Sequence, residues 1–548
     1  MMGLMQNRPL LLSGLIDHAA AYHGEREIVS HLVDGSMHRS NWRTIRTRAK
    51  QLANALQTLG VRQGDRVATL AWNTHRHLEM YFGVSGMGAV LHTVNPRLFP
   101  EQVSYILNHA EDGYVFFDTS FASLVQQVAP QLPRVKGYVA LCTRAQMPDI
   151  AVANLLCYED LLDAASPEYR WPTFDENTAS SLCYTSGTTG NPKGVLYSHR
   201  STMLHSWTAC AADGLALSAR DSVLLVVPLF HVNAWGVPYA GAMCGAKLVL
   251  PGPGLAGDNI YRLLREERCN FSLGVPTVWL GLFDYIERNQ ATLDLSELAL
   301  KRVVVGGSAA PRAMIEKFET LLGAYLIHAW GMSETSPLAS IGTLLDKHRD
   351  LPLEQRFDLQ VKQGRAIFGV EIEIFGEDGQ ALPHDGKAFG DLKARGPWVA
   401  AGYYRGEGGE VLDAEGWFPT GDVATLDADG FVQITDRSKD VIKSGGEWIS
   451  SIDLENIAVG HPAVKEAAVI GVAHSRWQER PLLLVCTKDG QSVTRDEMLA
   501  FMDGKVARWC LPDDVVTVDE LPHTATGKLQ KLKLREQFRS YRLPTDAA

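Results

Sequence analysis

The sequence has little cysteine, and none of it is arranged for metal binding or for a disulfide framework. Only 8 cysteines occur among 548 residues, and no two of them have the Cys-x-x-Cys spacing. Zinc sites and small disulfide-linked secreted folds both need clustered cysteines. Their absence argues against both classes and predicts a reducing, cytoplasmic location.

Long apolar runs and net positive charge are also missing. No uninterrupted apolar segment approaches the ~20 residues that span a bilayer. The apolar residues 9–16 are cut off by Asp17 and His18 and lack a signal peptide's basic start, so they predict an amphipathic helix. The formal net charge is -11, which is unfavourable for a nucleic-acid partner. We expect a soluble protein with neither an integral membrane segment nor a nucleic-acid partner.

The length and composition are those of a multidomain globular enzyme. Hydrophobic cores stop growing near roughly 250–300 residues, so 548 residues predict two or more domains. The chain is 46% hydrophobic and 21% charged, with 49 glycines and 25 prolines. This composition favours a loop-rich α/β protein over a helical bundle.

A helix–strand rhythm runs through the first 300 residues. Residues 41–60 have helical spacing, residues 67–71 form a short apolar run, and a helical segment at 78–90 leads into a strand-like 90–94. Further strand-like runs occur at 114–117, 137–141, 222–227, 247–250 and 302–305. This alternation predicts parallel α/β sheets, and the lack of a fixed period of 20–50 residues excludes a solenoid.

The pattern of predicted secondary structure changes after about residue 365. Short β-like runs at 370–374, 390–395 and 431–435 predict an antiparallel β subdomain, and residues 435–440 form a charged break. The roughly 110 residues beyond the break are enough for a small α+β domain. We therefore predict domains at 1–437 and 438–548.

One segment is rich in glycine, hydroxyl groups and one lysine, between Tyr184 and Val195. Its glycines let successive backbone N–H groups converge on an anion, and Lys193 adds a positive charge. The loop residues predicted to bind a polyphosphate are Thr185, Ser186, Gly187, Thr188, Thr189, Gly190 and Lys193.

A Walker A loop is excluded by its spacing. With four residues between it and Gly187, Pro192 stands where the second glycine must be, and Gly194 stands where a hydroxyl must follow the lysine. Proline also has no N–H to donate to a phosphate.

The loop resembles the signature of the adenylate-forming superfamily, which contains acyl-CoA synthetases, peptide-synthetase adenylation domains and luciferases. A second motif at 330–334 is similar to the family's aromatic-Gly-x-Thr-Glu, with Trp330 in place of Tyr and Ser333 in place of Thr. The resemblance implies that Trp330 stacks on adenine and that Glu334, with Thr185, binds Mg²⁺ through oxygen ligands. The same segment supplies the further implied ATP contacts His328, Ala329, Gly331 and Met332.

Three more motifs complete the implied nucleotide site. The segment 416–422 matches the family motif whose carboxylate, here Asp422, binds the ribose hydroxyls, and Arg437 is similar to an arginine that also reaches the ribose. Lys439 occupies the family's interdomain hinge. The resemblance assigns the strand-turn segment that contains Gly307, Ser308 and Ala309 to one wall of the acyl and adenine pockets.

The resemblance places the main catalytic residue near the C-terminus, at Lys528. A mobile Gly-Lys tip is a plain surface feature in most proteins, but in this family the lysine stabilises charge on the reacting phosphorus. The segment implied to line the CoA channel is Lys443, Ser444, Gly445, Gly446 and Glu447, followed by Trp448 where the family often has Asn.

His231 lies in the segment that sets specificity in the family. A satisfied core histidine is the alternative, whereas the family places a catalytic gate here, beside the acyl pocket. No acidic residue occurs between Asp221 and Asp258, so a buried substrate ammonium would lack a partner and an amino acid is disfavoured. The remaining implied acyl-pocket residues are Val232, Asn233, Trp235, Gly236 and Gly306.

The resemblance covers residues from about 40 to 535 in six ordered motifs. It implies a large α/β N-terminal domain of two βαβ sheet subdomains plus a β-barrel-like subdomain, with a small mobile α+β C-terminal domain. It also implies an AMP-forming acid–thiol ligase with Mg²⁺ as cofactor, ATP and CoA as co-substrates and a homodimeric state.

The motifs look most like those of bacterial medium-chain fatty-acid–CoA ligases and of ligases for 3-methylthiopropionate, a thioether acid, and they do not separate the two. A carrier-loading adenylation enzyme, a luciferase-like oxygenase and a non-catalytic nucleotide sensor remain as alternatives.

Overall fold

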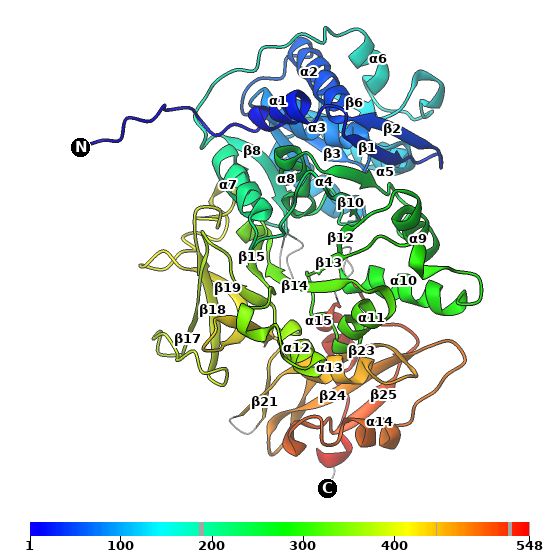
Figure 1. The fold of residues 1–548 in the computed structure, drawn as a ribbon, viewed down its shortest axis with the longest axis vertical. Helices are drawn as coiled ribbons and strands as arrows, with labels where there is room; N and C mark the ends of the chain where they lie inside the picture. Colours follow the sequence, from blue (N-terminus) through cyan, green and yellow to red (C-terminus); the bar gives the residue numbers. More distant parts are fainter. Residues whose placement is uncertain (186–190, 445–446, 524–528, 547–548) are drawn as a thin grey trace.

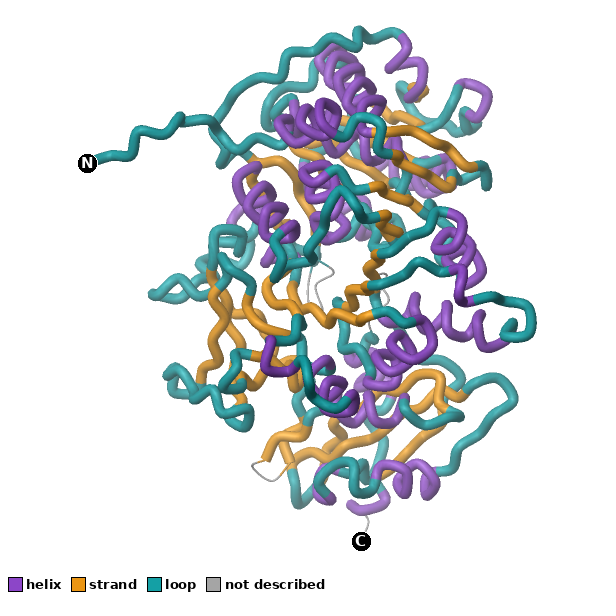
Figure 2. The backbone as a smooth tube through the Cα atoms, in the orientation of Figure 1, coloured by secondary structure: helices purple, strands orange, loops and turns teal. Residues whose placement is uncertain are grey.

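The computed structural model describes residues 1–185, 191–444, 447–523 and 529–546, and contains three β-sheets (Figures 1 and 2). Two sheets with flanking helices form most of the N-terminal part. The third sheet, at the lower end of the view in Figure 1, belongs to the C-terminal part.

The first sheet has seven strands in the order β7-β6-β5-β3-β4-β8-β9, all parallel to their neighbours except the edge strand β9. Its strands are β3 (Arg66–Leu70), β4 (Val90–Thr93), β5 (Tyr114–Phe117), β6 (Gly137–Ala140), β7 (Leu155–Cys157), β8 (Ala179–Tyr184) and β9 (Gly194–Ser198). Its helices are α2 (Trp42–Thr58), α3 (His75–Gly86), α4 (Pro100–Ala110), α5 (Ala122–Val128) and α6 (Tyr158–Asp163). The short β3, β4 and β5 are buried along their length because helices cover both faces.

The second sheet begins with a parallel half. Its strands are β1 (Glu27–His31), β11 (Lys247–Leu250), β10 (Ser222–Leu225), β12 (Phe271–Gly274), β13 (Arg302–Val305) and β14 (Tyr325–Gly331), with the antiparallel edge strand β2 (Met37–Asn41). Its helices are α1 (Ser13–Tyr22), α7 (His199–Cys210), α8 (Val237–Cys244), α9 (Gly257–Glu266), α10 (Pro276–Arg288) and α11 (Arg312–Leu322). The predicted parallel α/β architecture is confirmed.

The same sheet continues beyond β14 as an antiparallel half. These strands are β15 (Leu338–Ile341), β16 (Gly364–Ala366), β20 (Phe431–Arg437), β19 (Phe418–Leu426), β18 (Phe389–Arg395) and β17 (Glu371–Phe375), with α12 (Leu353–Gln360) between β15 and β16. The subdomain expected to be barrel-like is therefore hydrogen-bonded to the parallel half through β14 and β15.

The C-terminal sheet has five strands, in the order β22-β21-β24-β23 with β25 beside β24. They are β21 (Ile442–Ser444), β22 (Glu447–Ile449), β23 (Val464–His474), β24 (Gln478–Thr487) and β25 (Asp514–Thr517), with helices α13 (Ser451–Val459), α14 (Arg495–Met502) and α15 (Lys531–Gln537). Sheet membership changes between Arg437 and Ile442, and the division of the chain into domains at 437/438 stays a prediction.

Two local expectations differ from the structure. The first helix begins at Ser13, near the end of the apolar residues 9–16, and continues to Tyr22. The charged break expected from residue 435 begins only at Ser438, because β20 continues to Arg437. The side chain of Asp436, within the predicted break, is buried and accepts a hydrogen bond from the Ser451 backbone N–H (2.9 Å).

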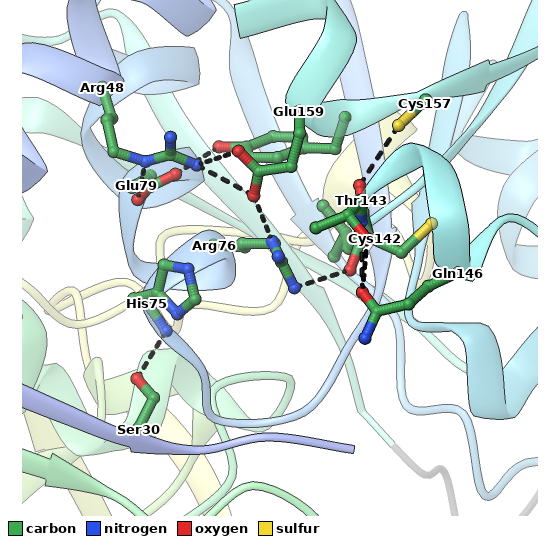
Figure 3. A network of polar contacts seen from close by, with 12 residues as sticks. Ser30, Arg48, His75, Arg76, Glu79, Cys142, Thr143, Gln146, Cys157 and Glu159 are labelled. Carbon is green, nitrogen blue, oxygen red and sulfur yellow. Dashed lines mark hydrogen bonds and ion pairs between the residues drawn. The ribbon is translucent and has the colours of Figure 1, made fainter. Parts of the chain in front are cut away.

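A buried ion network joins three helices on the first sheet (Figure 3). Arg48 on α2 donates to Glu79 on α3 (2.6 Å), and Arg76 on α3 donates to Glu159 on α6 (2.6 Å). Arg48 also contacts Glu159 (3.0 Å), and the fully buried Glu79 accepts from the Tyr158 hydroxyl (2.7 Å). Both carboxylates thus have cationic partners.

Among the helices that the structure describes, none has both the length and the apolar character needed to cross a bilayer.

Candidate active site

A cavity of about 550 Å³ gathers most of the motif residues that fall in the described part of the chain. Loops after β8, β10, β13 and β14 contribute to its wall, as do residues 419–421 of β19 and the residues after β20. Ligands of parallel α/β sheets commonly bind beyond the carboxyl ends of the strands, and four of these loops leave such ends. The predicted residues in the wall are Thr185, Lys193, His231, Val232, Trp235, Gly306, Gly307, Ala329, Trp330, Gly331, Met332, Ser333, Glu334, Arg437 and Lys439.

The polyphosphate loop is closed at its base by the backbone. The N–H of Thr185 donates to the carbonyl of Lys193 (2.9 Å), so the chain returns to the same point eight residues later. The side chain of Lys193 reaches over the ring of Tyr403, with 4.7 Å between Nζ and the ring centroid. The predicted contacts Ser186, Gly187, Thr188, Thr189 and Gly190 lie outside the described residues.

Glu334 is positioned by a residue that the motifs did not identify. Its side chain is 6% exposed and its Oε1 accepts a hydrogen bond from the Tyr403 hydroxyl (2.7 Å). Its backbone carbonyl accepts from the Ala400 N–H (2.7 Å). Because Mg²⁺ prefers oxygen ligands and binds through few protein carboxylates plus phosphates, Glu334 and Thr185 in one cavity fit that ion.

Trp330 and Asp422 are joined directly. The indole Nε1 of Trp330 donates to Asp422 Oδ2 (2.8 Å), and Arg437 Nε lies 2.8 Å from Asp422 Oδ1. Asp422 is buried behind the wall, which its neighbours Thr420 and Gly421 line. A tyrosine at position 330 has no ring N–H, so this orientation of the ring depends on the tryptophan found here.

The strand-turn segment after β13 is divided between two cavities. Gly306 and Gly307 line the main cavity, whereas Ser308 and Ala309 line a neighbouring cavity of about 260 Å³. Gly307 also lines the second cavity and has a φ of +79°, a conformation that favours glycine.

His328 is placed behind the wall and lines neither cavity. Its Nδ1 lies 2.9 Å from the Val361 carbonyl and its Nε2 accepts from the Ala310 N–H (3.2 Å). Burial lowers the pKa of His328 to about 4, so the ring is neutral at physiological pH.

His231 and Trp235 form part of the wall with Leu215, Val304 and Leu338, which give this side an apolar character. Residues 232–235 all have positive φ values (39° to 56°), a left-handed turn that is rare for residues with side chains. Asn233 and Gly236 do not line the cavity. Asn233 donates to the Ser181 hydroxyl (2.9 Å), and Gly236 lies against the His205 ring.

The C-terminal part reaches the cavity with Lys439, Asp440 and Leu529. Burial lowers the pKa of Lys439. Lys528 lies outside the described residues, directly before Leu529.

Among the residues predicted to line the CoA channel, the described ones do not line this cavity. Lys443 and Ser444 belong to β21, where Arg480 donates to the Ser444 hydroxyl (3.2 Å), and Glu447 begins β22. Gly445 and Gly446 lie outside the described residues.

The junction between the two parts contains a buried polar network that the sequence did not reveal. Lys531 on α15 contacts Glu455 on α13 (2.7 Å) and donates to the Ser451 hydroxyl. Ser451 in turn donates to Asp436 at the end of β20. Burial opposes the charge on Lys531, but Glu455 and Asp436 together raise its pKa, so the lysine is protonated.

Comparison with known proteins identifies the family of this chain. Residues 16–404 match the model of the AMP-binding enzyme family, and residues 453–528 match the AMP-binding enzyme C-terminal domain. The chain belongs to the AMP-binding enzyme family.

The individual relatives are CoA ligases. The chain is 52% identical to a 3-methylmercaptopropionyl-CoA ligase of Ruegeria lacuscaerulensis, over 98% of this chain and 99% of that protein. It is 49% identical to a medium-chain-fatty-acid–CoA ligase of Ectopseudomonas oleovorans, over 98% of each chain. The fold matches a crystal structure of the anthranilate CoA ligase AuaEII in complex with anthranoyl-AMP, with a TM-score of 0.85 at 24% identity over 97% and 99% of the two chains. The predicted superfamily and the class of AMP-forming acyl-CoA ligases are confirmed.

Proposed function

We propose that this protein activates an apolar carboxylic acid with ATP and transfers the acyl group to CoA. In the first step the acid's carboxylate oxygen bonds to the α-phosphorus of ATP as the bond to diphosphate breaks. In the second step the CoA thiol loses its proton and attacks the acyl carbonyl, and AMP leaves. The observation that carries this proposal is one cavity that holds Thr185, Lys193, Trp330 and Glu334 beside the apolar side of His231 and Trp235.

The residue roles follow from chemistry and position. The loop from Thr185 to Lys193 would hold the departing diphosphate, Trp330 would stack on adenine, and Asp422 with Arg437 would bind the ribose hydroxyls. Mg²⁺, held by Glu334 and Thr185, would neutralise charge on the phosphates. The catalysis then rests on positioning and charge neutralisation.

Lys528 is proposed to stabilise the charge that develops at the α-phosphorus. Leu529 lines the cavity, which supports an approach of the preceding lysine to the reacting end. The second step would require the C-terminal domain to turn at Lys439 and bring residues 443–447 to the CoA channel. His231 would act as the gate of the acyl pocket.

The acid is proposed to be of medium chain length, with a short thioether acid such as 3-methylthiopropionate as the alternative. Leu215, Val304 and Leu338 supply an apolar wall. The segment between Asp221 and Asp258, which contains His231 and Trp235, has no acidic residue to pair with a substrate ammonium group. A thioether sulfur resembles a methylene in size, and one methylene changes discrimination by only about 1–3 kcal/mol. The two relatives, which are named for these two kinds of acid, support both candidates.

Acid-dependent exchange of diphosphate into ATP tests the first step. The panel runs from acetate to dodecanoate and pairs 3-methylthiopropionate with pentanoate, its carbon analogue. A maximum of kcat/KM between hexanoate and decanoate supports the medium-chain proposal. A preference of more than tenfold for 3-methylthiopropionate over pentanoate selects the thioether acid, and no acid-dependent exchange at all contradicts the proposed reaction.

The substitution Lys528→Ala separates the two steps. We expect it to abolish diphosphate exchange, while a separately supplied acyl-adenylate is still converted to acyl-CoA. Lys531→Arg, which keeps the charge three residues away, serves as the control. Loss of both steps in a folded Lys528→Ala variant would exclude the assigned role.

We also propose that the protein is a cytoplasmic homodimer. The scarce, dispersed cysteines support the compartment, and the family resemblance supports the dimer. Light scattering of the purified protein tests the second point, and a mass of one chain would contradict it.

A further inference from the structure

Two thiols lie at the C-terminal ends of the neighbouring helices α7 and α8. Cys210 ends α7, Cys244 ends α8, and both are partly exposed. The sulfur of Cys210 lies 3.5 Å from the Ala240 carbonyl, and that of Cys244 lies 3.9 Å from the Gly241 carbonyl. Ala240 is one helical turn before Cys244, so the two sulfurs share one face of α8. The two thiols lie close enough for each to shift the pKa of the other.

This contact makes the two sulfurs chemically unequal. The neighbouring Cys210 thiol lowers the pKa of Cys244, aided by the Ala246 backbone N–H and opposed by burial and the charge of Asp221. The same contact, with burial, raises the pKa of Cys210. Cys244 is thus the better nucleophile, because the thiolate is the reactive form, and Cys210 lies beside it as a second thiol.

We propose that Cys210 and Cys244 form a peroxide-sensitive modification site that closes to a reversible disulfide. The Cys244 thiolate attacks one oxygen of hydrogen peroxide, the O–O bond breaks, and Cys244 sulfenic acid and hydroxide form. The Cys210 sulfur then attacks the Cys244 sulfur, the S–S bond forms, and the departing hydroxide takes the Cys210 proton as water. The two thiols lose two electrons in total, and a low-molecular-weight thiol reductant restores them.

The site goes beyond the proposed function, but it would act on the same cavity. His205 on α7 accepts a hydrogen bond from the Leu338 N–H (3.2 Å), and its ring lies against Gly236 at the start of α8. Leu338 and Trp235, which precedes Gly236, both line the cavity. A bond between the ends of α7 and α8 would fix the spacing of the two helices that hold this apolar side.

The chain contains a matched control pair, Cys142 and Cys157 (Figure 3). Both are buried, and the Cys157 thiol donates to the Cys142 backbone carbonyl (3.2 Å). Burial raises the pKa of Cys142 to about 12. Two neighbouring thiols that are buried should resist the same oxidant.

Thiol mapping of the folded, full-length protein tests the site without any activity measurement. The protein is treated with a small excess of hydrogen peroxide, its remaining thiols are alkylated in denaturant, and the peptides are analysed by mass spectrometry without reduction. We expect an intramolecular Cys210–Cys244 link that dithiothreitol removes, with Cys142 and Cys157 alkylated. No such link, a link that forms only after unfolding, or equal oxidation of the control pair would overturn the proposal.

Kinetics test the effect on the cavity. In the oxidised wild type we expect the KM for the longest accepted acid to rise at least threefold, with the KM for ATP unchanged and dithiothreitol reversing the change. The variants Cys210→Ser and Cys244→Ser should form no such link and should show no dithiothreitol-reversible rise in the acid KM. A mapped link with unchanged acid KM would refute the coupling to the cavity. Absence of acid-dependent exchange in untreated protein would refute the proposed reaction, and the mapping would still decide the thiol site.

Discussion

Tyr403 shows how a single side chain can order the polar part of the cavity. Its hydroxyl holds Glu334 at 2.7 Å, and its ring lies 4.7 Å from the ammonium group of Lys193. One residue thus contacts both the carboxylate proposed to bind Mg²⁺ and the lysine of the polyphosphate loop. Its position on a loop after β18, far along the chain from both partners, explains why no motif contains it.

Removing only the hydroxyl tests this role at the residue scale. Hydrogen bonds to charged groups contribute roughly 1.5–3 kcal/mol, so Tyr403→Phe should raise the Mg²⁺ concentration for half-maximal diphosphate exchange by about tenfold or more. The retained ring keeps its contact with Lys193. Tyr404→Phe serves as the neighbouring control, and an unchanged Mg²⁺ dependence would show that the hydroxyl does not position Glu334.

The buried ion network of α2, α3 and α6 is the clearest stabilising feature at the scale of elements. Glu79→Ala leaves Arg48 with Glu159 as its remaining carboxylate. Breaking a buried pair destabilises by about 3–5 kcal/mol, and we expect the lower part of that range. Chemical unfolding followed by tryptophan fluorescence measures it.

The matched surface control for that network is Glu25→Ala. Glu25 pairs with Arg43, but both side chains are largely exposed, so little change in stability is expected. Equal effects of the two substitutions would contradict the importance of burial.

Asp118, at the end of β5, predicts a pH dependence of folding. Burial raises its pKa from 3.8 to about 7, although its side chain accepts from the Trp72 N–H (2.7 Å). The unfolded chain therefore loses this proton near pH 4 and the folded chain near pH 7. The protonated Asp118 therefore contributes fully to the stability of the folded state below pH 4, and this contribution is lost as the pH rises to 7.

The substitution Asp118→Asn should remove this dependence. The Asn carbonyl still accepts from Trp72. Between pH 4 and 7 the free energy of unfolding of the wild type should fall by at most about 1.4 kcal/mol per pH unit because of Asp118, and the variant should lack this fall. At pH 8 the variant should be more stable than the wild type. Unfolding curves across this range measure the slope. Asp34→Asn is the control, because hydrogen bonds from Ser36 lower the pKa of Asp34. Parallel profiles of wild type and Asp118→Asn would contradict the assignment.

The whole molecule is joined across the junction by Lys531, Glu455, Ser451 and Asp436. Lys531→Ala would leave two buried carboxylates without their cation. We expect faster hydrogen exchange of α13, measured by mass spectrometry, and faster proteolytic cleavage near residues 438–441.

The double variant Lys531→Met with Glu455→Gln tests whether charge is the cause. Removing both partners of a buried pair is often close to neutral, so protection of α13 should largely return. Equal exchange in the single and double variants would show that the loss comes from packing.

Local residue chemistry made much of the fold and site predictable. Short apolar runs between helical segments indicated the parallel strands, because strands buried on both faces need apolar residues throughout. Glycines, hydroxyls and Lys193 within a few residues indicated the polyphosphate loop, because an anion cradle needs that backbone freedom and those donors. Trp330, Glu334 and Arg437 were found through their motifs and line the same cavity as that loop.

Other features depend on partners that are distant in sequence. Asp436 belongs to the predicted charged break, yet it accepts a hydrogen bond from Ser451 and interacts with the charge of Lys531. Asn233 belongs to a predicted pocket segment, yet Ser181 holds its side chain behind the wall. The sequence by itself determined the α/β class and predicted the polyphosphate loop, because both depend on residues that are neighbours in the chain. Only the tertiary structure decided which of these groups face the cavity, that Tyr403 joins Glu334 to Lys193, and that Cys210 meets Cys244, because those contacts depend on how separate elements pack.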